Sequence, residues 1–272
     1  MATIKYAAVR TPAQSIVDGL SIDQSAKNPD YRAAIAQHQE YCPALQDMGY
    51  TLIVLPPDDA HPDSVFTEDP VVILNDLLIK ARLQDPSRRG EEDALFNALT
   101  RTRYFPEEKR FAINAPGTLE GGDTIFTGDR LFVGITRRTN ILGARQLGKI
   151  ARDVFGVPLS LIPLPDTVLH LKSIASFVRN ADGEGYILAE ARFAGLFERA
   201  GYPVIPTPGT RRFDSNVVMS PDGHRGLIHD PRPDTAAILK RIGVTPVPVN
   251  LDQFELIDGA ASCLSKCFTV NR

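Results

Sequence analysis

The chain has 272 residues, a formal charge of −3 at pH 7 and 43% hydrophobic residues. This charge balance provides no basic surface for nucleic acid or an anionic membrane, and the hydrophobic share suffices for an ordinary core. The N-terminal sequence MATIKYAAVRTPA lacks the apolar stretch of a signal peptide, and no apolar run reaches the roughly 18 residues that span a membrane. We therefore expect a cytoplasmic protein without nucleic-acid or membrane partners. Its three cysteines, Cys42, Cys263 and Cys267, are too few and too unevenly spaced for a disulfide framework or a zinc site.

Apolar segments that end at proline, glycine or polar turns alternate with amphipathic segments along the whole chain, which is typical of an α/β protein. The expected strands are 4–11, 50–57, 71–74, 158–165, 186–189, 202–208 and 244–250, with two short ones within 125–135. The expected helices are 31–48, 87–99, 141–155, 190–200 and 235–242. The turn-rich residues 17–21 have the composition of a flexible flap.

The stretch PGTLEGGD, residues 116–123, places one carboxylate, Glu120, between turn residues and a glycine pair. Because Gly121 and Gly122 have no Cβ, the backbone there can closely approach a ligand or another chain segment. A carboxylate in this setting is by itself usually a surface turn residue. Similar polar residues recur along the chain, however, and that recurrence favours a functional interpretation.

One marker from each recurring unit can be taken: Glu68, Glu120, His170, Asn216 and Cys263. Their successive spacings are 52, 50, 46 and 47 residues, so five units of similar length account for nearly the whole chain. Repeats of this period are typical of propeller-like or solenoid architectures, in which equivalent positions converge on one axis. The period therefore predicts a cluster of carboxylates, histidine, asparagine and thiol at one centre.

The chemistry of such a cluster suits a cationic substrate. A cysteine such as Cys263 is a nucleophile when nearby positive charge stabilises its thiolate, and the imidazole of His170 can transfer the accompanying protons. Carboxylates at Asp69 and Glu120 would bind a guanidinium or amidinium group, whose charge would help to lower the pKa of the thiol. A peptide or ester substrate would call for oxyanion donors instead. Metal ligands some 50 residues apart have no sequence signature, so no metal or other cofactor is expected.

The sequence resembles the dimethylarginine dimethylaminohydrolases, or dimethylargininases, of the guanidine-modifying (pentein) superfamily. The matching segments are RTPAQSIVDGL, LPPDDAHPDSVFTEDPV, SRRGE, APGTLEGGDTIFTGDRLFVGITRRTN, VLHLKS and IDGAASCLS. EGGD and HLKS are shared by the wider superfamily, whereas PDSVFTEDP, SRRGE and RRTN together indicate the narrower family. The resemblance implies one catalytic domain over residues 1–272, folded as a five-bladed α/β propeller of ββαβ modules with pseudo-fivefold symmetry. This five-bladed fold agrees with the five units of similar length that the spacing of the marker residues indicates.

The resemblance also implies roles for individual residues. Cys263 matches the nucleophile, His170 the general acid and base, and Glu120 the acidic residue that pairs with this histidine. The matching substrate-binding positions are Glu68 and Asp69 for the guanidinium nitrogens, Arg88 and Arg138 for the α-carboxylate, Phe66 for the alkyl chain, and Leu20, Asp63 and Ile257 for the α-amino end. In the family the residue at Leu20 lies on a mobile lid, and the one at Ile257 acts through its backbone carbonyl. Residues without a match are His38, His61, His224 and His229, expected at the surface, and Cys267, expected to be structural or idle.

The activity implied is hydrolysis of Nω-methylated L-arginine to L-citrulline and dimethylamine or methylamine, through a covalent thiouronium on Cys263. An arginine deiminase-like hydrolase of another guanidino compound is the alternative within the same chemistry. A propeller that binds ligand without catalysis is the alternative outside it. The expected partner is a small guanidino substrate, and the expected assembly is a monomer or homodimer.

Overall fold

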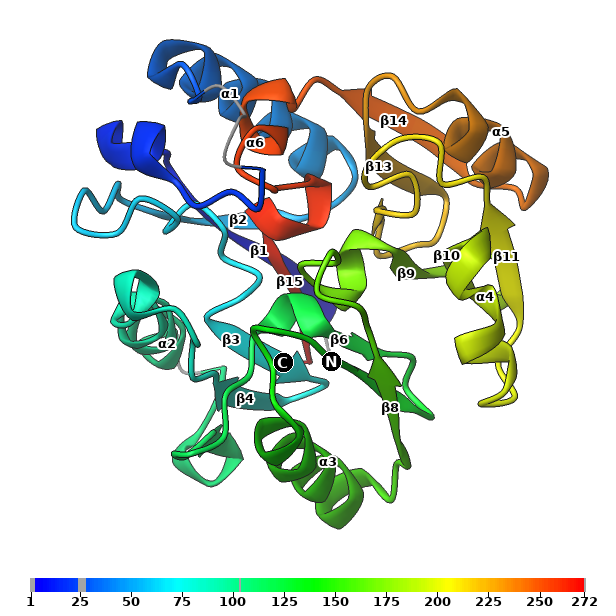
Figure 1. Ribbon diagram of the computed structural model, residues 1–272, viewed down its shortest axis with the longest axis horizontal. Coiled ribbons are helices and arrows are strands. Elements are labelled where there is room, and N and C mark those ends of the chain that lie inside the picture. Colours follow the sequence, from blue (N-terminus) through cyan, green and yellow to red (C-terminus); the bar gives the residue numbers. More distant parts are fainter. Residues whose placement is uncertain (1–2, 24–27, 103, 272) are drawn as a thin grey trace.

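Five three-stranded sheets surround a central axis in the computed structural model, which describes residues 3–23, 28–102 and 104–271 (Figure 1). In spatial order the sheets are β15-β1-β2, β3-β4-β5, β6-β7-β8, β9-β10-β11 and β12-β13-β14. The strands of the first three are β1 (Thr3–Arg10), β2 (Thr51–Leu55), β3 (Val71–Leu74), β4 (Leu77–Lys80), β5 (Arg110–Ala112), β6 (Thr124–Phe126), β7 (Leu131–Ile135) and β8 (Leu159–Pro163). The remaining strands are β9 (Ala175–Arg179), β10 (Gly185–Glu190), β11 (Val204–Thr207), β12 (Val218–Met219), β13 (Arg225–His229), β14 (Thr245–Val249) and β15 (Lys266–Asn271).

Each sheet is one blade with the same connectivity. Its first two strands pair antiparallel, and its third strand is parallel to the second. A parallel pair needs a crossover, and a helix supplies it in every blade. These helices are α1 (Tyr31–Asp47), α2 (Glu91–Thr100), α3 (Ile141–Phe155), α4 (Ala191–Glu198) and α5 (Pro233–Arg241). They lie on the outside of the ring (Figure 1), and the predicted propeller of ββαβ modules is confirmed.

The first blade closes the ring with both ends of the chain. Strand β15 pairs antiparallel with β1, with Tyr6 opposite Phe268 and Ala8 opposite Lys266. The Tyr6 and Phe268 rings stack with centroids 5.5 Å apart. The C-terminal segment around Cys263 is thereby held beside segments from the beginning of the chain.

Local sequence explains most element boundaries. Asp30 caps α1 by accepting a hydrogen bond from the Ala33 N–H, and Asn140 caps α3 by accepting one from Gly143. The helix predicted over 87–99 was wrong at its start. Pro86–Arg88 forms a separate 3₁₀ turn, η2, and α2 begins only at Glu91 because Gly90 takes a left-handed conformation with φ of 114°.

Apolar packing forms five clusters that join neighbouring blades. One of them brings Leu77 of β4 and Val133 of β7 against Leu147 of α3. Two histidines expected at the surface are buried: His38, which contacts the Cys42 sulfur within α1, and His229, which accepts the Leu251 N–H. Each fills space between a helix or loop and a sheet, which sequence spacing did not reveal.

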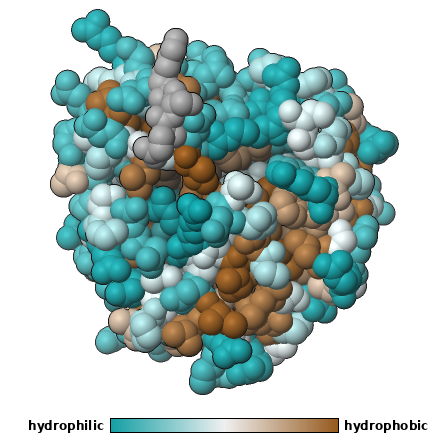
Figure 2. Space-filling view, in the orientation of Figure 1, coloured by the Kyte–Doolittle hydropathy of each residue, from teal (hydrophilic) through white to brown (hydrophobic). Residues whose placement is uncertain are grey.

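The outer surface is mostly polar on the face shown in Figure 2, with apolar colour gathered where α3 and β8 lie. Large apolar side chains that α3 leaves exposed are Ile141, Leu142 and Val154. Within the described residues, no helix combines the length and apolar character needed to cross a membrane.

Candidate active site

The glycine pair of EGGD packs the third blade against the second. Gly121 N–H donates to the Asp69 carbonyl at 2.9 Å, and Gly122 N–H donates to Asp69 Oδ1 at 3.0 Å. A Cβ on Gly121 would lie 2.0 Å from the Glu68 carbonyl oxygen, and one on Gly122 would lie 2.9 Å from the His170 ring. The close approach expected from the sequence is confirmed, and its partner is the backbone that carries Asp69.

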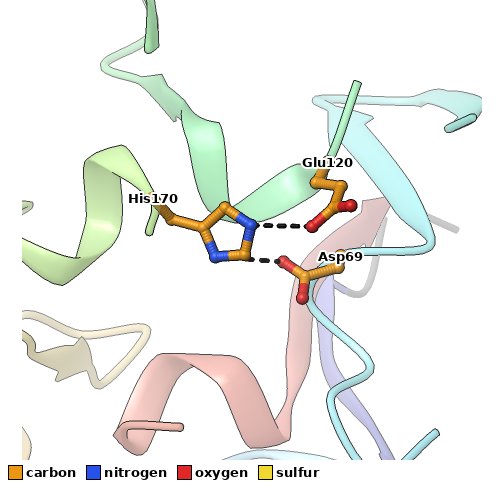
Figure 3. Close-up of side chains that lie close together, drawn as sticks. All are labelled: Asp69, Glu120 and His170. Atoms are coloured by element: carbon orange, nitrogen blue, oxygen red, sulfur yellow. Dashed lines mark hydrogen bonds and ion pairs between the residues drawn. The ribbon is translucent and has the colours of Figure 1, made fainter. Parts of the chain in front are cut away.

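His170 lies between two carboxylates, Glu120 from the loop before β6 and Asp69 from the loop before β3 (Figure 3). Its Nε2 is 2.7 Å from Glu120 Oε2, and its Nδ1 is 4.0 Å from Asp69 Oδ1. Glu120 is completely buried, and His170 and Asp69 are nearly so. A buried imidazole between two buried carboxylates is stabilised in its charged form.

The protonation states follow from this arrangement. Burial alone would lower the pKa of His170, but Asp69, Asp123 and Glu120 outweigh it and raise that pKa to about 9. Burial raises the pKa of Asp69, yet the charges of His170 and Arg88 reverse this and lower it to about 2. Burial raises the pKa of Glu120, but the hydrogen bond to His170 and the charges of His170 and Arg88 together outweigh it and lower that pKa. At neutral pH the site therefore holds an imidazolium and two carboxylates.

A small, partly enclosed cavity with a volume of about 20 Å³ lies beside this group. Its lining residues are Leu20, Asp63, Phe66, Asp69, Arg88, Arg138, Leu169, His170, Ile257, Asp258, Gly259 and Cys263. The structure thus brings nine of the sequence-predicted residues to one cavity. Glu120 lies outside the lining set, bonded to His170. The open volume holds about one water, so a larger ligand requires the walls to move.

Cys263 lies in the 3₁₀ turn η6 (Ala261–Leu264). This turn is held in place by Asn216, one of the five residues that mark the repeat. Asn216 Oδ1 accepts the Ser262 N–H at 2.9 Å, and Asn216 Nδ2 donates to the Lys172 carbonyl at 2.9 Å. Asn216 therefore ties the segment before the thiol to the segment after His170. Burial, reinforced by Asp69, raises the pKa of Cys263 to about 12, so the sulfur is a thiol at neutral pH in this arrangement.

Glu68, expected to hold guanidinium nitrogens, is not brought into this cavity. Its Oε1 accepts from the ammonium groups of Lys172 and Lys266, the latter at 2.9 Å. Its backbone N–H donates to the Cys263 carbonyl at 3.2 Å. Glu68 thus lies on the side of the Cys263 segment that faces away from the catalytic cavity, and it lines a different cavity.

The two cavity arginines contact the carboxylates that were expected to bind a guanidinium. Arg88 Nη1 is 2.9 Å from Asp69 Oδ2, and its Nε and Nη2 make paired hydrogen bonds to Glu91 at 3.0 and 2.8 Å. Arg138 Nη1 is 3.6 Å from Glu120 Oε1. The protein's own guanidinium groups therefore offset the charges of these carboxylates.

The segment at one edge of the cavity is held by two further carboxylates. Asp63 accepts the Leu20 N–H at 3.1 Å, and Asp258 accepts the Ile22 N–H while also pairing with Arg212. Asp258 has φ of 60°, which is uncommon for a residue other than glycine. Part of the predicted flap, residues 17–21, is the 3₁₀ turn η1 (Gln14–Asp18), and residues 24–27 lie outside the described part of the chain.

Sequence reasoning missed three residues that position the site. Asp123 accepts the Leu171 N–H at 2.9 Å and the Thr136 hydroxyl at 2.8 Å, which fixes the backbone after His170. Glu91 holds Arg88, and Lys172 pairs with Glu68. Asp123 and Glu91 belong to the motifs EGGD and SRRGE, so the signal that could have found them was their place in a motif already singled out.

Two groups of side chains among the described residues each bring three potential metal-ligand atoms together. The ligand atoms of Asp69, Glu120 and His170 lie within 4.8 Å of one another, as do those of His229, Asp252 and Glu255. In the first group Arg88 already pairs with Asp69, and in the second Arg232 donates to Glu255 at 2.9 Å. A guanidinium therefore competes with a cation in both groups.

A family model described as "N,N dimethylarginine dimethylhydrolase, eukaryotic" matches residues 19–154. The N(G),N(G)-dimethylarginine dimethylaminohydrolase of Pseudomonas aeruginosa is 34% identical over 97% of this chain and 99% of its own length. The chain belongs to the dimethylarginine dimethylaminohydrolase family. The enzyme of the same name from Streptomyces coelicolor is 32% identical, over 96% of both chains. The resemblance inferred from the motifs is thereby confirmed.

Solved structures agree with this assignment. A cysteine-to-serine variant of the P. aeruginosa enzyme in complex with citrulline has a TM-score of 0.88, covering 97% of this chain and 99% of that one. An adduct of a dimethylarginine dimethylaminohydrolase with S-methyl-L-thiocitrulline has a TM-score of 0.87, at 34% identity and over 97% and 100% of the two chains. The N-terminal domain of ArgZ, a cyanobacterial arginine dihydrolase, is 17% identical with a TM-score of 0.76 over 97% of both chains, so it shares the fold.

Proposed function

We propose that this protein hydrolyses Nω-methylated L-arginine to L-citrulline and dimethylamine or methylamine. One observation carries the proposal: Cys263, His170 and Asp69 line a single small cavity, with Glu120 buried directly behind the imidazole. A thiol, a charged imidazole and two carboxylates form a set suited to a planar cation with an electrophilic carbon. The whole chain, residues 1–272, acts as one catalytic domain in this proposal, which the pairing of β15 with β1 supports.

Substrate binding exchanges one guanidinium for another. The substrate's guanidinium takes the place of Arg88 at Asp69, and Arg88 with Arg138 then meets the substrate α-carboxylate. Leu20, Asp63 and Ile257 surround the α-amino end, and Phe66 lies along the alkyl chain. This exchange suits a cavity as small as this one, because the same movement that frees Asp69 makes room for the ligand.

Two half-reactions follow. The bound cation lowers the pKa of Cys263, which releases its proton to solvent because His170 is already protonated, and the thiolate adds to the guanidinium carbon. His170, protonated at neutral pH, donates its proton to the departing amine as the carbon–nitrogen bond breaks, leaving an S-alkylthiouronium. The now neutral imidazole accepts a proton from water as the water adds to the same carbon. The carbon–sulfur bond then breaks, releasing citrulline and restoring the cysteine.

The test measures citrulline and released amine with asymmetric dimethylarginine, monomethylarginine and arginine in parallel. The wild type should release dimethylamine or methylamine, and Cys263→Ser should form no citrulline while still binding the substrate in calorimetry. Ammonia from arginine without reaction of the methylated substrates would replace the proposal with a deiminase activity. Turnover by Cys263→Ser would reject the assigned nucleophile.

A further inference from the structure

A second cavity opens at the other end of the propeller axis. It has a volume of about 660 Å³ and is lined by residues from the inner strands of all five blades, β3, β6, β9, β12 and β15. None of its lining residues also lines the catalytic cavity. Its inner end, which we call the channel head, is formed by Glu68, Lys172, Lys266 and Ser262, behind the segment that carries Cys263.

The channel head contains two ammonium groups on one carboxylate oxygen. Lys172 Nζ and Lys266 Nζ both donate to Glu68 Oε1. The Lys266 side chain is only 5% exposed and that of Glu68 only 6%. Each ammonium has three N–H donors, and in the described part of the chain this single oxygen is the acceptor that the two share. Most of these donors therefore need acceptors that the cavity itself must hold.

The charges at the channel head do not balance. Two lysines face one glutamate, which leaves one excess positive charge in a largely buried setting. Burial lowers the pKa of Lys266, while Glu68 and Asp69 oppose this; Asp69 also accepts hydrogen bonds from Arg88 and from the Gly122 N–H. Farther along the cavity Arg179 and Asp222 contribute one charge of each sign. A water molecule would satisfy the donors, but it would leave the buried excess charge uncompensated.

Polar groups around the lysines can add to the binding of a compact ion. Ser262 Oγ accepts a hydrogen bond from Asn216 Nδ2 at 2.8 Å, and Ser176 Oγ accepts one from the Val217 N–H at 3.1 Å. With their oxygens occupied in this way, both hydroxyl hydrogens can point into the cavity. From this geometry we infer that the channel head is a binding site for a small anion, a halide or the phosphate or carboxylate group of a small molecule, held by Lys172 and Lys266.

The experiment that locates the anion is bromide soaking of wild-type crystals with anomalous diffraction. A bromide peak within hydrogen-bonding distance of Lys172 Nζ and Lys266 Nζ is expected. The same soak of Lys266→Met crystals should show no peak there, because the remaining lysine and Glu68 form a neutral pair. A channel head that contains only water in the wild type would overturn the inference.

Solution measurements separate the possible anions. At constant ionic strength, bromide, phosphate and acetate are titrated while the melting temperature is followed, and at least one of them should raise it by a few degrees in the wild type. Lys266→Met should lose this increment. Lys172→Met, whose lysine is less buried, provides a second variant if the first does not fold.

The matched control is Lys149→Met, which removes an exposed lysine paired with Asp153 on α3 and should retain the full increment. Equal increments in all four proteins would show that the salts act on the whole surface and would reject the site. Because binding is followed without turnover, failure of this site would leave the proposed hydrolase activity standing, and the converse also holds.

Discussion

Both ends of the propeller axis contain clusters of charged side chains, but the charges are paired differently and the cavities differ greatly in size. At the catalytic end, carboxylates, arginines and an imidazolium neutralise one another around a cavity of about 20 Å³. At the other end, two lysines share one glutamate oxygen at the head of a cavity of about 660 Å³. The catalytic end is the narrower one, and most of its charged groups have a partner of opposite charge in the protein. At both ends of the axis the fold brings equivalent residues of the five blades together. The comparison indicates that the pairing of their charges decides which end is tightly packed.

Among the substitutions that test this comparison of the two ends, the largest effect should come from adding one methyl group at the catalytic end. Gly122→Ala would place a Cβ 2.8 Å from Asp69 Oδ1 and 2.9 Å from the His170 ring. Gly122 does not have a positive φ, so the expected damage comes from this steric clash and not from backbone strain. We expect citrulline formation to fall at least about 100-fold, because small displacements of catalytic groups have effects of this size. Gly195→Ala on α4, where a Cβ meets only the end of Arg199, is the control and should be active and equally or more stable. An active Gly122→Ala enzyme would contradict the tight packing described here.

The charged state of His170 should appear as a pH dependence of stability. Its pKa is raised from 6.5 to about 9 in the folded protein, so its contribution is fully present below pH 6.5 and lost as pH rises through 9. The wild type should therefore lose on the order of 2–3 kcal/mol across this window relative to His170→Asn. Urea unfolding of both proteins at several pH values measures the difference. Parallel curves would show that the imidazole is not held as a cation.

Arg138→Ala should mainly weaken substrate binding. Arg138 lines the cavity and lies 3.6 Å from Glu120, but we assign its main contact to the substrate α-carboxylate, remote from the reacting carbon. KM should rise about tenfold or more while kcat changes less. Steady-state kinetics on a methylated arginine and on its α-amide, which lacks the carboxylate, provide the check. If kcat/KM of the variant falls by the same factor on both substrates, the assigned contact is wrong.

The smallest effect should follow a change at the wide end of the axis. Cys267 lines the large cavity, and its sulfur lies 3.5 Å from Ser265 Oγ. Cys267→Ala should keep kcat/KM within about twofold and cost about 1 kcal/mol of stability at most. Kinetics and urea unfolding together measure both quantities. A loss of activity comparable with that of Gly122→Ala would break the contrast between the two ends.

Much of the site could be predicted because its residues belong to a repeat. Glu120, His170 and Cys263 recur at similar spacing, and a propeller carries equivalent positions to one axis. The same reasoning placed Glu68 with Asp69, since adjacent residues share a segment. In the strandless stretch before β3, however, the two side chains diverge, and Asp69 lies at the catalytic cavity while Glu68 contacts the lysines. Adjacent sequence positions do not specify which end of an axis a side chain faces.

The sequence by itself determined the five-unit propeller, the family and the chemical character of the cavity, because these depend on periodicity and on motifs of a few consecutive residues. Only the tertiary structure decided which charges meet. The pairing of Arg88 with Asp69 and Glu91, the pairing of Glu68 with Lys172 and Lys266, and the burial of His38 and His229 all depend on contacts between distant segments. The strength of a Coulomb interaction and the burial of a side chain both depend on which groups are close in space. Spacing along the chain specifies that closeness only within a single helix or strand.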